Sequence, residues 1–278
     1  MEFVVIIIGL VVILVIFGYS RWQIETDRLY SKLSSNSNTI KSLKYNSDQL
    51  NGLPKPVQRY FKTVLKEGQS MVSSVTIEHT GTFNMSETGE FWRPFSSIQR
   101  VTIDRPGFVW SGKIKLIPAL AVCVNDAYIA GKGLLKASFA GLISLVKEEG
   151  SCELNRGELM RFFAESAWYP TALLPTQGVR WEEVNSFSAR AVMRDGEISV
   201  TLLFSFNDYG LIESVYADAR GRSVKGEIVL TPWEGRWSRY EVHNGMLIPT
   251  EGEVAWILPD GRKPYWRGRI EKIDHKFS

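Results

Sequence analysis

The stretch DGEISVTLLFSFNDYG, residues 195–210, decides the fold, because it shows one strand with a tight turn at each end. Apolar side chains occupy every second position: Ile198, Val200, Leu202, Phe204 and Phe206. That period of two predicts a half-buried strand with one face toward a core. The flanking Asp-Gly and Asn-Asp-Tyr-Gly segments favour the positive φ of short hairpin turns. Strands joined so closely must be antiparallel neighbours in one sheet.

The same period of two recurs along most of the chain. It is present in VTIEHTGTF, residues 75–83, and in GFVWSGKIKL, residues 107–116. Further hairpin dipeptides stand at Asn244-Gly245 and Asp260-Gly261. Strands do not alternate with helices in the manner of a parallel α/β sheet. The chain is therefore predicted to be mainly β (α+β), with a large curved antiparallel sheet or incomplete barrel.

Three further segments are expected to be helical and to cover the concave side of that sheet. Residues 57–65 repeat apolar side chains at i, i+3, i+4 and i+7, which is typical of an amphipathic helix. We interpret it as packed on the core rather than on a membrane surface. Residues 154–168 form the clearest helix of the body, and residues 134–146, LLKASFAGLISLV, have a helical or mixed pattern. Helices would then interrupt the sheet near its centre.

The composition limits the classes of partner. The chain has 278 residues, enough for an anchor plus one large domain or two small ones. Its net charge is only +3, so there is no strongly basic field and nucleic acid is not an expected partner. Nine tryptophans and an aromatic share of 12% favour a β-rich fold with an apolar face to fill.

The N-terminal segment predicts a membrane anchor. Residues 3–19, FVVIIIGLVVILVIFGY, carry no charge and would span about 25 Å as a helix, near the lower limit for crossing a bilayer. A cleaved signal peptide is the alternative, but it would favour a basic start and a small-x-small cleavage site, whereas the chain starts Met1-Glu2. We therefore expect a single-pass membrane protein that meets the membrane through this helix.

The segments after the anchor predict a linker and one domain. Residues 20–52 contain many Ser and Asn residues, especially toward the end of this range, and we interpret them as a linker or spacer. We interpret residues 53–278 as a single β-rich domain. Basic residues follow the anchor and none precedes it. The positive-inside rule therefore places the domain on the cytoplasmic side.

The most site-like stretch is GELMRFFAESAWYPTALLP, residues 157–175. On a helix, Glu158, Arg161 and Glu165 fall within about 60° of one another, a spacing that suits ion pairs. One interpretation makes a carboxylate a general acid or base and lets Arg161 bind an anion. The other is a salt-bridged face that is solvated or exposed at a rim, and we favour it because no nucleophile, histidine or metal ligand stands nearby in sequence.

A second candidate is a group of aromatic side chains. The last fifty residues contain four of them, Trp233, Trp237, Trp256 and Trp266. Trp168 stands at the end of the helix predicted over 154–168. They indicate either an aromatic-lined pocket for an apolar or carbohydrate ligand or packing of the core. The candidate ligand-binding residues are Glu158, Arg161, Glu165, Trp168, Trp233, Trp237, Trp256 and Trp266.

The remaining reactive side chains do not define a catalytic or metal site. Cys123 and Cys152 are not in a metal-type spacing; they could form a disulfide in an oxidising compartment, but two buried free thiols are the simpler expectation. The three histidines lack metal-spaced partners, and no Gly-x-Ser-x-Gly elbow is present. No metal, no cofactor and no catalytic residue is predicted.

Several motifs in matching order resemble a mainly bacterial family known only as a domain of unknown function. They are LPKPVQRYF, GELMRFFAESAWYPTALLP, TPWEGRW, PTEGEVAW and YWRGRI. The likeness runs from about Leu53 to Ile273 and implies no particular activity or catalytic residue. In architecture the chain also resembles the lipoprotein-carrier (Lol-type) fold, a curved sheet capped by helices around an apolar cavity for acyl chains. That resemblance implies a domain outside the cytoplasmic membrane, opposite to the charge rule.

These observations lead to three functional hypotheses. The first is a membrane-anchored domain, without catalysis, that binds a lipid or other hydrophobic ligand in the concavity of the sheet, with Arg161 at the rim meeting an anionic headgroup. The second is an envelope-associated hydrolase that uses Glu158, Glu165 or Asp126. The third is a protein-interaction scaffold that docks a partner through Trp233 and Trp237.

Overall fold

The structure is a computed structural model, and it describes residues 2–36, 44–86 and 89–278. Its main feature is a single antiparallel sheet of 13 strands in the order β6-β5-β4-β3-β2-β1-β13-β12-β11-β10-β9-β8-β7. The strands are β1 Val72–Asn84, β2 Trp92–Thr102, β3 Gly107–Ile117, β4 Leu120–Ile129, β5 Lys132–Phe139, β6 Ile143–Glu149, β7 Arg180–Asn185, β8 Ser188–Asp195, β9 Ile198–Phe206, β10 Ile212–Val224, β11 Glu227–His243, β12 Met246–Leu258 and β13 Gly261–Phe277.

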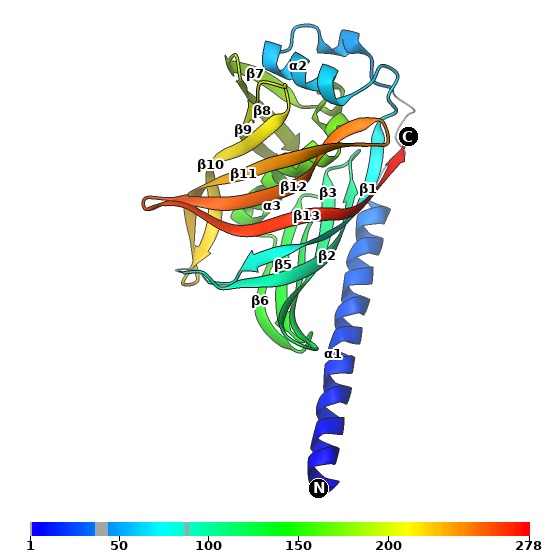
Figure 1. Ribbon diagram of the computed structural model, residues 1–278, viewed down its shortest axis with the longest axis vertical. Helices are drawn as coiled ribbons and strands as arrows, with labels where there is room; N and C mark the ends of the chain where they lie inside the picture. The colour runs from blue at the N-terminus through cyan, green and yellow to red at the C-terminus, as the bar shows by residue number, and fades with distance from the viewer. Residues whose placement is uncertain (1, 37–43, 87–88) are drawn as a thin grey trace.

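The order of the strands follows from the hairpins. Each half of the chain adds strands outward one at a time, and the pairing of β1 with β13 joins the two halves. The sheet curves strongly, yet within the described residues its edge strands β6 and β7 do not pair with each other (Figure 1). The predicted curved sheet or incomplete barrel is thereby confirmed.

The turns lie where the sequence predicts them. Asp195-Gly196 joins β8 to β9, and Asp260-Gly261 joins β12 to β13. At Asn244 and Gly245 the φ angles are 51° and 85°, the positive pair that a two-residue hairpin turn requires.

The helix α3, Cys152–Glu165, lies inside the curve of the sheet (Figure 1). The Ser151 hydroxyl accepts a hydrogen bond from the backbone N–H of Leu154 and caps the first turn. Three short 3₁₀ turns continue it: η2 Ser166–Trp168, η3 Pro170–Leu173 and η4 Pro175–Gln177. The predicted helix over 154–168 is confirmed. It contacts β4 and β5 from one half of the sheet and β9 and β10 from the other, so it bridges both.

The prediction of a helical or mixed segment at 134–146 is wrong. These residues form β5 and β6, joined by a turn in which Ala140 and Gly141 have positive φ. A short run of apolar residues fits either a helix or a strand, and the pairing of β5 with β4 decides between them.

The helix α2, Lys55–Val64, covers one end of the sheet with the 3₁₀ turn η1, Ser47–Leu50 (Figure 1). Tyr60 and Phe61 are fully buried, with their rings against Phe206 of β9 and Trp181 of β7, so the predicted core helix is confirmed. Pro56 occupies its first turn, where a missing N–H is tolerated.

The N-terminal helix α1, Glu2–Ser35, is longer than the anchor predicted from the sequence. Its first half is apolar and exposed, and it is the one helix among the described residues long and apolar enough to cross a membrane. Its second half packs on the outer face of β2, β3 and β4 and buries Trp22, Tyr30 and Leu33. Thr26 also hydrogen-bonds Asn125 across this contact, at 3.1 Å.

Residues 20–35 therefore do not form the spacer expected from their composition. The Ser31 and Ser34 hydroxyls donate to carbonyls four residues earlier within the helix. Of the predicted linker, residues 37–43 lie outside the described residues.

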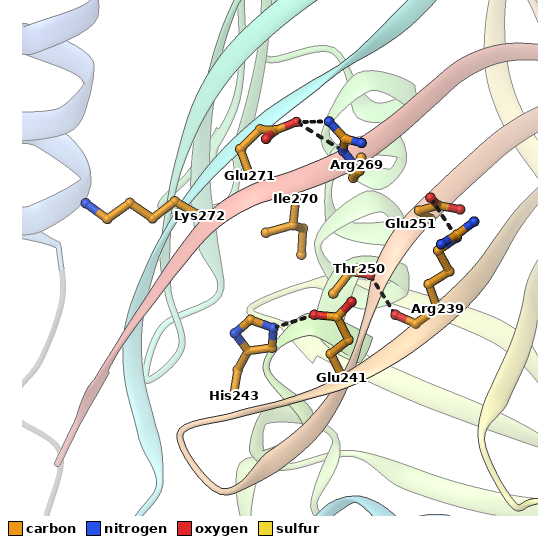
Figure 2. Close-up of a pocket in the computed structure, with 9 residues that line it drawn as sticks. All are labelled: Arg239, Glu241, His243, Thr250, Glu251, Arg269, Ile270, Glu271 and Lys272. Carbon is orange, nitrogen blue, oxygen red and sulfur yellow. Dashed lines mark hydrogen bonds and ion pairs between the residues drawn. The ribbon is translucent and has the colours of Figure 1, made fainter.

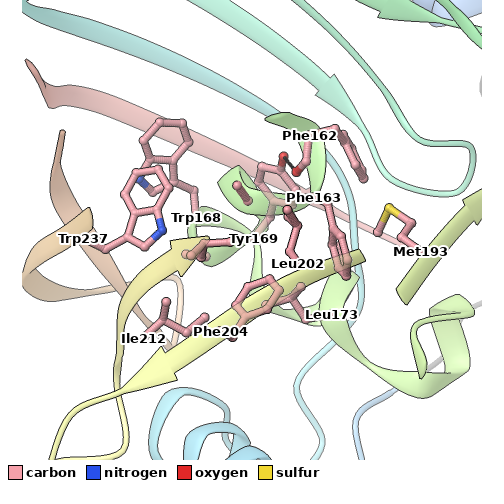
Figure 3. Packing of buried hydrophobic residues seen from close by; sticks show 14 of the residues in the cluster. Phe162, Phe163, Trp168, Tyr169, Leu173, Met193, Leu202, Phe204, Ile212 and Trp237 are labelled. Carbon is pink, nitrogen blue, oxygen red and sulfur yellow. Dashed lines mark hydrogen bonds between the residues drawn. The ribbon is translucent and has the colours of Figure 1, made fainter. Parts of the chain in front are cut away.

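The core fills the space between α3, α2 and the inner face of the sheet. It is unusually aromatic, with Trp168, Tyr169, Phe162 and Phe163 beside Phe204 (Figure 3). Trp168 meets Trp237 edge-on at 5.0 Å between ring centroids. Burial of such side chains is the main source of stability here.

Candidate functional site

The polar side of α3 points into the sheet and is held there by ion pairs. Arg161 donates through Nη1 to Asp126 Oδ2 of β4 at 2.6 Å and through Nε to Glu165 Oε1 at 2.7 Å. Gln99 of β2 donates through Nε2 to the second oxygen of Glu165 at 2.6 Å. Side chains of two strands therefore converge on the Arg161–Glu165 pair of the helix.

A second ion pair lies nearer the N-terminus on the same face of the helix. Arg220 of β10 reaches Glu158 Oε1 at 3.3 Å. Both arginines also lie over aromatic rings, Arg161 over Phe108 and Trp110 and Arg220 over Trp233. Stacking on rings is a property of the planar guanidinium, and it holds the two charges in an otherwise apolar interior. Asp126, Glu158, Arg161, Glu165, Arg220 and Gln99 together are called the inner polar cluster below.

The inner polar cluster is buried, which corrects the expectation of a solvated or rim-exposed face. Side chains of Glu158, Glu165 and Arg161 are only 6%, 11% and 16% exposed. Their helix is enclosed because the sheet curves around it, so apolar contacts surround even its polar side. The sequence shows the stripe on the helix, but it does not show the strands that cover the stripe.

Burial changes the protonation of the cluster. Burial, together with the charge of Asp126, raises the pKa of Glu158 well above its usual value, although Arg220 and Arg161 oppose this shift. Three carboxyl groups face two arginines, so full ionisation would leave one buried negative charge without a partner. A proton on Glu158 removes that charge, as for other closely spaced carboxyl pairs.

Several buried polar atoms in and around the inner polar cluster have no hydrogen-bond partner among the described residues. Three are oxygens: Asp126 Oδ1, Glu158 Oε2 and Gln99 Oε1. The proton on Glu158 lets its carboxyl donate to Asp126, which leaves the Gln99 oxygen as the unpaired acceptor. Nearby are the indole N–H of Trp110 and both ring nitrogens of His79. Burial and the charge of Arg161 lower the pKa of His79 to about 3, so its ring is neutral. Unpaired buried polar atoms are costly, and they gather where a fold serves a purpose beyond its own packing.

A row of glycines and indole rings lines the inner face beside the cluster. Gly81, Gly268 and Gly252 are directly paired across β1, β13 and β12. A Cβ atom at Gly268 would lie 2.2 Å from the Trp266 ring, and one at Gly252 would lie 2.5 Å from the Trp237 ring. The rings therefore lie flat against bare backbone, and the glycines let the sheet curve.

The structure brings all the predicted site residues to the inner face. Trp237 and Trp266 belong to the glycine row, Trp168 packs on Trp237, and Trp256 stacks on Tyr265 at 5.7 Å between centroids. Trp233 donates through Nε1 to the hydroxyl of Tyr265 at 2.8 Å.

The scaffold hypothesis loses its basis from this placement. Trp233 and Trp237 are only 2% and 5% exposed, so they cannot form a docking surface for a protein. Arg161 likewise does not stand at a rim.

Sequence reasoning missed four members of the site: Gln99, Trp110, Arg220 and His79. One signal could have found part of it. Three Trp-x-Gly triplets occur, at 110–112, 233–235 and 266–268, and residues i and i+2 of a strand share one face. An indole next to a glycine on the same face indicates a ring lying over backbone. Gln99 and Arg220 carry no comparable local signal.

The reactive groups outside the cluster are separate from it. Cys123 is buried and Cys152 is exposed, and both are free, so the expectation that both thiols are buried is wrong for Cys152. Within the described residues no group of three or more His, Cys, Asp or Glu side chains could hold a metal ion.

A hollow of about 390 Å³ lies on the outer face of β11, β12 and β13 (Figure 2). Its charges pair with one another, Arg239 with Glu251 at 3.0 Å and Arg269 with Glu271 at 2.7 Å. His243 faces Glu241 at 3.7 Å. A surface whose ions already neutralise one another offers little to a ligand, so the inner face is the better candidate site.

Fold and site together define a class: an open, strongly curved antiparallel sheet wrapped around one helix, with an ionic and aromatic interior and an N-terminal apolar helix. Residues 51–275 match the family of unknown function DUF6920, and the chain belongs to this family. The family resemblance seen in the motifs is thereby confirmed. No curated protein matches the chain.

Two solved structures are among those similar to the chain. A LolA-superfamily protein from Nitrosomonas europaea matches with a TM-score of 0.42 and 8% identity, over 80% of this chain and 93% of that one. A beta-barrel-like protein of the domain of unknown function DUF1849 from Brucella abortus matches with a TM-score of 0.20 and 10% identity, over 75% of this chain and all of that one.

Proposed function

We propose that this protein is a membrane-anchored domain that binds an amphiphilic ligand on the inner face of its sheet. The observation that carries the proposal is the buried inner polar cluster, where the described residues leave the Gln99 oxygen, the Trp110 N–H and the His79 ring nitrogens unpaired. The ligand's polar end lies at this cluster, and its apolar part lies along the adjacent strands. The anchor holds the domain at the bilayer, the source of such ligands.

The apolar part of the site consists of half-buried side chains on the inner face. Leu116, Val124 and Ala137 extend from Asp126 toward the β3–β4 turn, and each is packed against the core but partly exposed. Val124 lies two residues from Asp126 on the same strand, and it pairs with Ala137. On the opposite side of Asp126, Tyr128 is fully buried. Space for an apolar chain is therefore expected on the side of the β3–β4 turn.

The polar part of the site selects the headgroup. Arg161 already binds two carboxylates and Arg220 binds Glu158, so neither guanidinium is free for an anion. With Glu158 donating to Asp126, the cluster atom left unpaired is the Gln99 oxygen, an acceptor, and the Trp110 N–H nearby is an unpaired donor; a hydroxyl can pair with both. We therefore propose an uncharged, hydroxyl-bearing headgroup, in place of the anionic one expected from the sequence.

Lipid binding by the full chain purified in mild detergent tests this function. We expect native mass spectrometry to find a co-purified uncharged lipid, and a pyrene-labelled monoacylglycerol to bind more tightly than a pyrene-labelled fatty acid. Val124→Asp places a charge on the apolar path and should weaken binding at least tenfold. Tyr209→Asp, an exposed position beyond β9, is the matched control and should bind as the unaltered chain does.

Two results would contradict the proposal in different ways. Absence of any co-purified lipid together with no uptake of either probe removes the binding function. Tighter binding of the fatty acid removes the assignment of an uncharged headgroup and leaves the apolar site in place.

Hydrolysis is the second candidate, favoured by the raised pKa of Glu158 beside Asp126. A protonated carboxyl next to an ionised one is the arrangement that general acid–base catalysis uses. If the chain hydrolyses a fluorogenic ester or glycoside, Glu158→Gln should abolish turnover while ligand retention persists. Turnover unchanged in this variant would exclude Glu158 as the acid.

A further inference from the structure

We infer that the turns between β3 and β4 and between β5 and β6 are immersed in the interfacial region of the bilayer that α1 crosses. The surface they form, called the tip surface below, consists of residues 117–120 and 140–146. The inference rests on α1 crossing the membrane, which is part of the proposed function, and it does not depend on ligand binding.

Contacts to α1 fix the height of the tip surface relative to the membrane. The Tyr19 hydroxyl donates to the carbonyl of Ala119 and accepts from the N–H of Ala121, both at 3.0 Å. Gly18 packs so closely on the β5–β6 turn that a Cβ there would lie 2.2 Å from the Ala140 carbonyl oxygen. Gly18 and Tyr19 are the last two residues of the uncharged apolar segment, so they mark the edge of the hydrocarbon layer. The two turns therefore lie at that edge (Figure 1).

The tip surface is apolar and exposed. Ile117, Ile143 and Leu145 are 60%, 61% and 53% exposed. Ile143 and Leu145 belong to β6, an edge strand, and an exposed apolar edge strand is an aggregation hazard unless something covers it. A bilayer at the height of Tyr19 covers these side chains without a further partner.

Basic side chains flank the tip surface on the side of α1. Lys113 and Lys115 of β3 are exposed, and Lys113 Nζ lies 5.5 Å from the centroid of the Tyr19 ring. Arg21 follows on α1, also exposed. Lysine and arginine just above a hydrocarbon edge bind anionic headgroups, so the charges complement a membrane surface.

Depth-dependent fluorescence quenching in the full chain tests this inference. Cys123 is buried, so Cys152→Ser leaves no accessible thiol, and single cysteines are then introduced and labelled with a polarity-sensitive bimane. Test positions are Ile117→Cys and Ile143→Cys. Leu10→Cys in the apolar half of α1 is the positive control, and Tyr209→Cys and Val242→Cys, both exposed at other places on the domain, are negative controls. The protein is placed in nanodiscs that contain lipids with a nitroxide at a shallow acyl position.

We expect quenching of at least twofold at Ile117→Cys, Ile143→Cys and Leu10→Cys, and none at Tyr209→Cys or Val242→Cys. Quenching at Leu10→Cys without quenching at the two tip positions overturns the inference and leaves the membrane span standing. No quenching at Leu10→Cys removes the span, and with it both the tip surface and the anchoring part of the proposed function. An unchanged circular dichroism spectrum shows that each labelled chain is folded.

Discussion

Glu158 shows how far a single side chain depends on its surroundings in this protein. On an isolated helix it would be an ordinary ionised partner of Arg161. Inside the curved sheet it shares a region with two other carboxyl groups, and its pKa is raised mainly by burial. Its charge is therefore set by strands that lie far from it in sequence, β4 and β10.

Glu158→Gln should change the pH dependence of stability more than stability itself. The unfolded chain releases this proton near pH 4.3, whereas the folded chain keeps it to a higher pH. The folded state then binds more protons, so this carboxyl makes stability fall as pH rises from the unfolded pKa through the raised folded pKa. Glutamine is neutral throughout, so the variant should lack that fall and differ by about 1 kcal/mol or less where Glu158 is protonated. Urea unfolding followed by tryptophan fluorescence from pH 5 to 8 measures both.

Arg161→Met is the contrasting change in the same experiment. It leaves Asp126 and Glu165 buried without their guanidinium partner, and we expect a loss of about 3–5 kcal/mol. Equal effects of the two substitutions would show that Glu158 is ionised in the folded protein.

His79→Phe should reduce sensitivity to acid. The ring of His79 lies between Trp168 and Trp266, and its folded pKa of about 3 is below the unfolded value of about 6.5. The unfolded state then binds more protons as pH falls through 6.5, so stability is lost, by about 2 kcal/mol between pH 7 and pH 5. Phenylalanine keeps the ring contacts and cannot be protonated. Thermal melts at both pH values should show a smaller decrease for the variant, and an identical decrease would rule out His79 as the group responsible.

The glycine row is the feature at the scale of elements that positions the site. It lies where β1, β13 and β12 pair and where the indole rings of Trp237 and Trp266 rest on the sheet. Side chains at these positions would push the rings away from the backbone and flatten the curve. The curvature that encloses α3 and the flat packing of the rings therefore have one common cause.

Gly81→Ala should be more destabilising than any other alanine substitution in this row. Its Cβ would lie 1.9 Å from the backbone carbonyl oxygen of Arg267, which cannot turn aside as a side chain can. We expect a loss of about 3 kcal/mol, the upper part of the range for overpacked sites. Gly89→Ala is the matched control, since its Cβ would meet nothing closer than 3.6 Å. If the two variants unfold at the same urea concentration within error, the clash at Gly81 does not destabilise the sheet.

Local patterns predict the strands and most turns of this protein, because alternation and Asn-Gly or Asp-Gly dipeptides act within a few residues. They fail at 134–146, where an apolar run suits two structures and only the partner strand decides. They fail again at residues 20–35, where Ser-rich composition suggests a spacer. The buried face of Trp22, Thr26, Tyr30 and Leu33 has meaning only against β3 and β4.

The candidate site also has a part that local sequence patterns predict and a part that they do not. The stripe of Glu158, Arg161 and Glu165 is readable from helical spacing. Its partners are not, because Asp126 is 35 residues from Arg161 and Gln99 is 66 residues from Glu165. Topology brings them together, so sequence reasoning finds the helix side of the cluster and misses most of the sheet side.

At the scale of the whole molecule, the sheet is packed directly on the long helix α1. α1 runs from the proposed membrane span to the outer face of β3 and β4 without a break, so the domain cannot swing freely on a linker. The Lys136–Glu25 ion pair and the Thr26–Asn125 hydrogen bond hold the two together. Orientation of the helix in the bilayer therefore fixes the orientation of the inner face as well.

The domain is expected on the cytoplasmic side of the membrane. Arg21, Arg28 and Lys32 follow the apolar half of α1 within the distance over which basic residues set orientation. Tyr209→Cys in the Cys152→Ser background reports the side, since position 209 is 80% exposed. In spheroplasts of a bacterial expression host, an impermeant maleimide should label this cysteine only after the membrane is permeabilised. Glu2→Cys, at the other end of the span, should show the opposite pattern. Labelling of Tyr209→Cys in intact spheroplasts would place the domain outside, and changing Arg21, Arg28 and Lys32 to Gln should then leave that orientation unaltered.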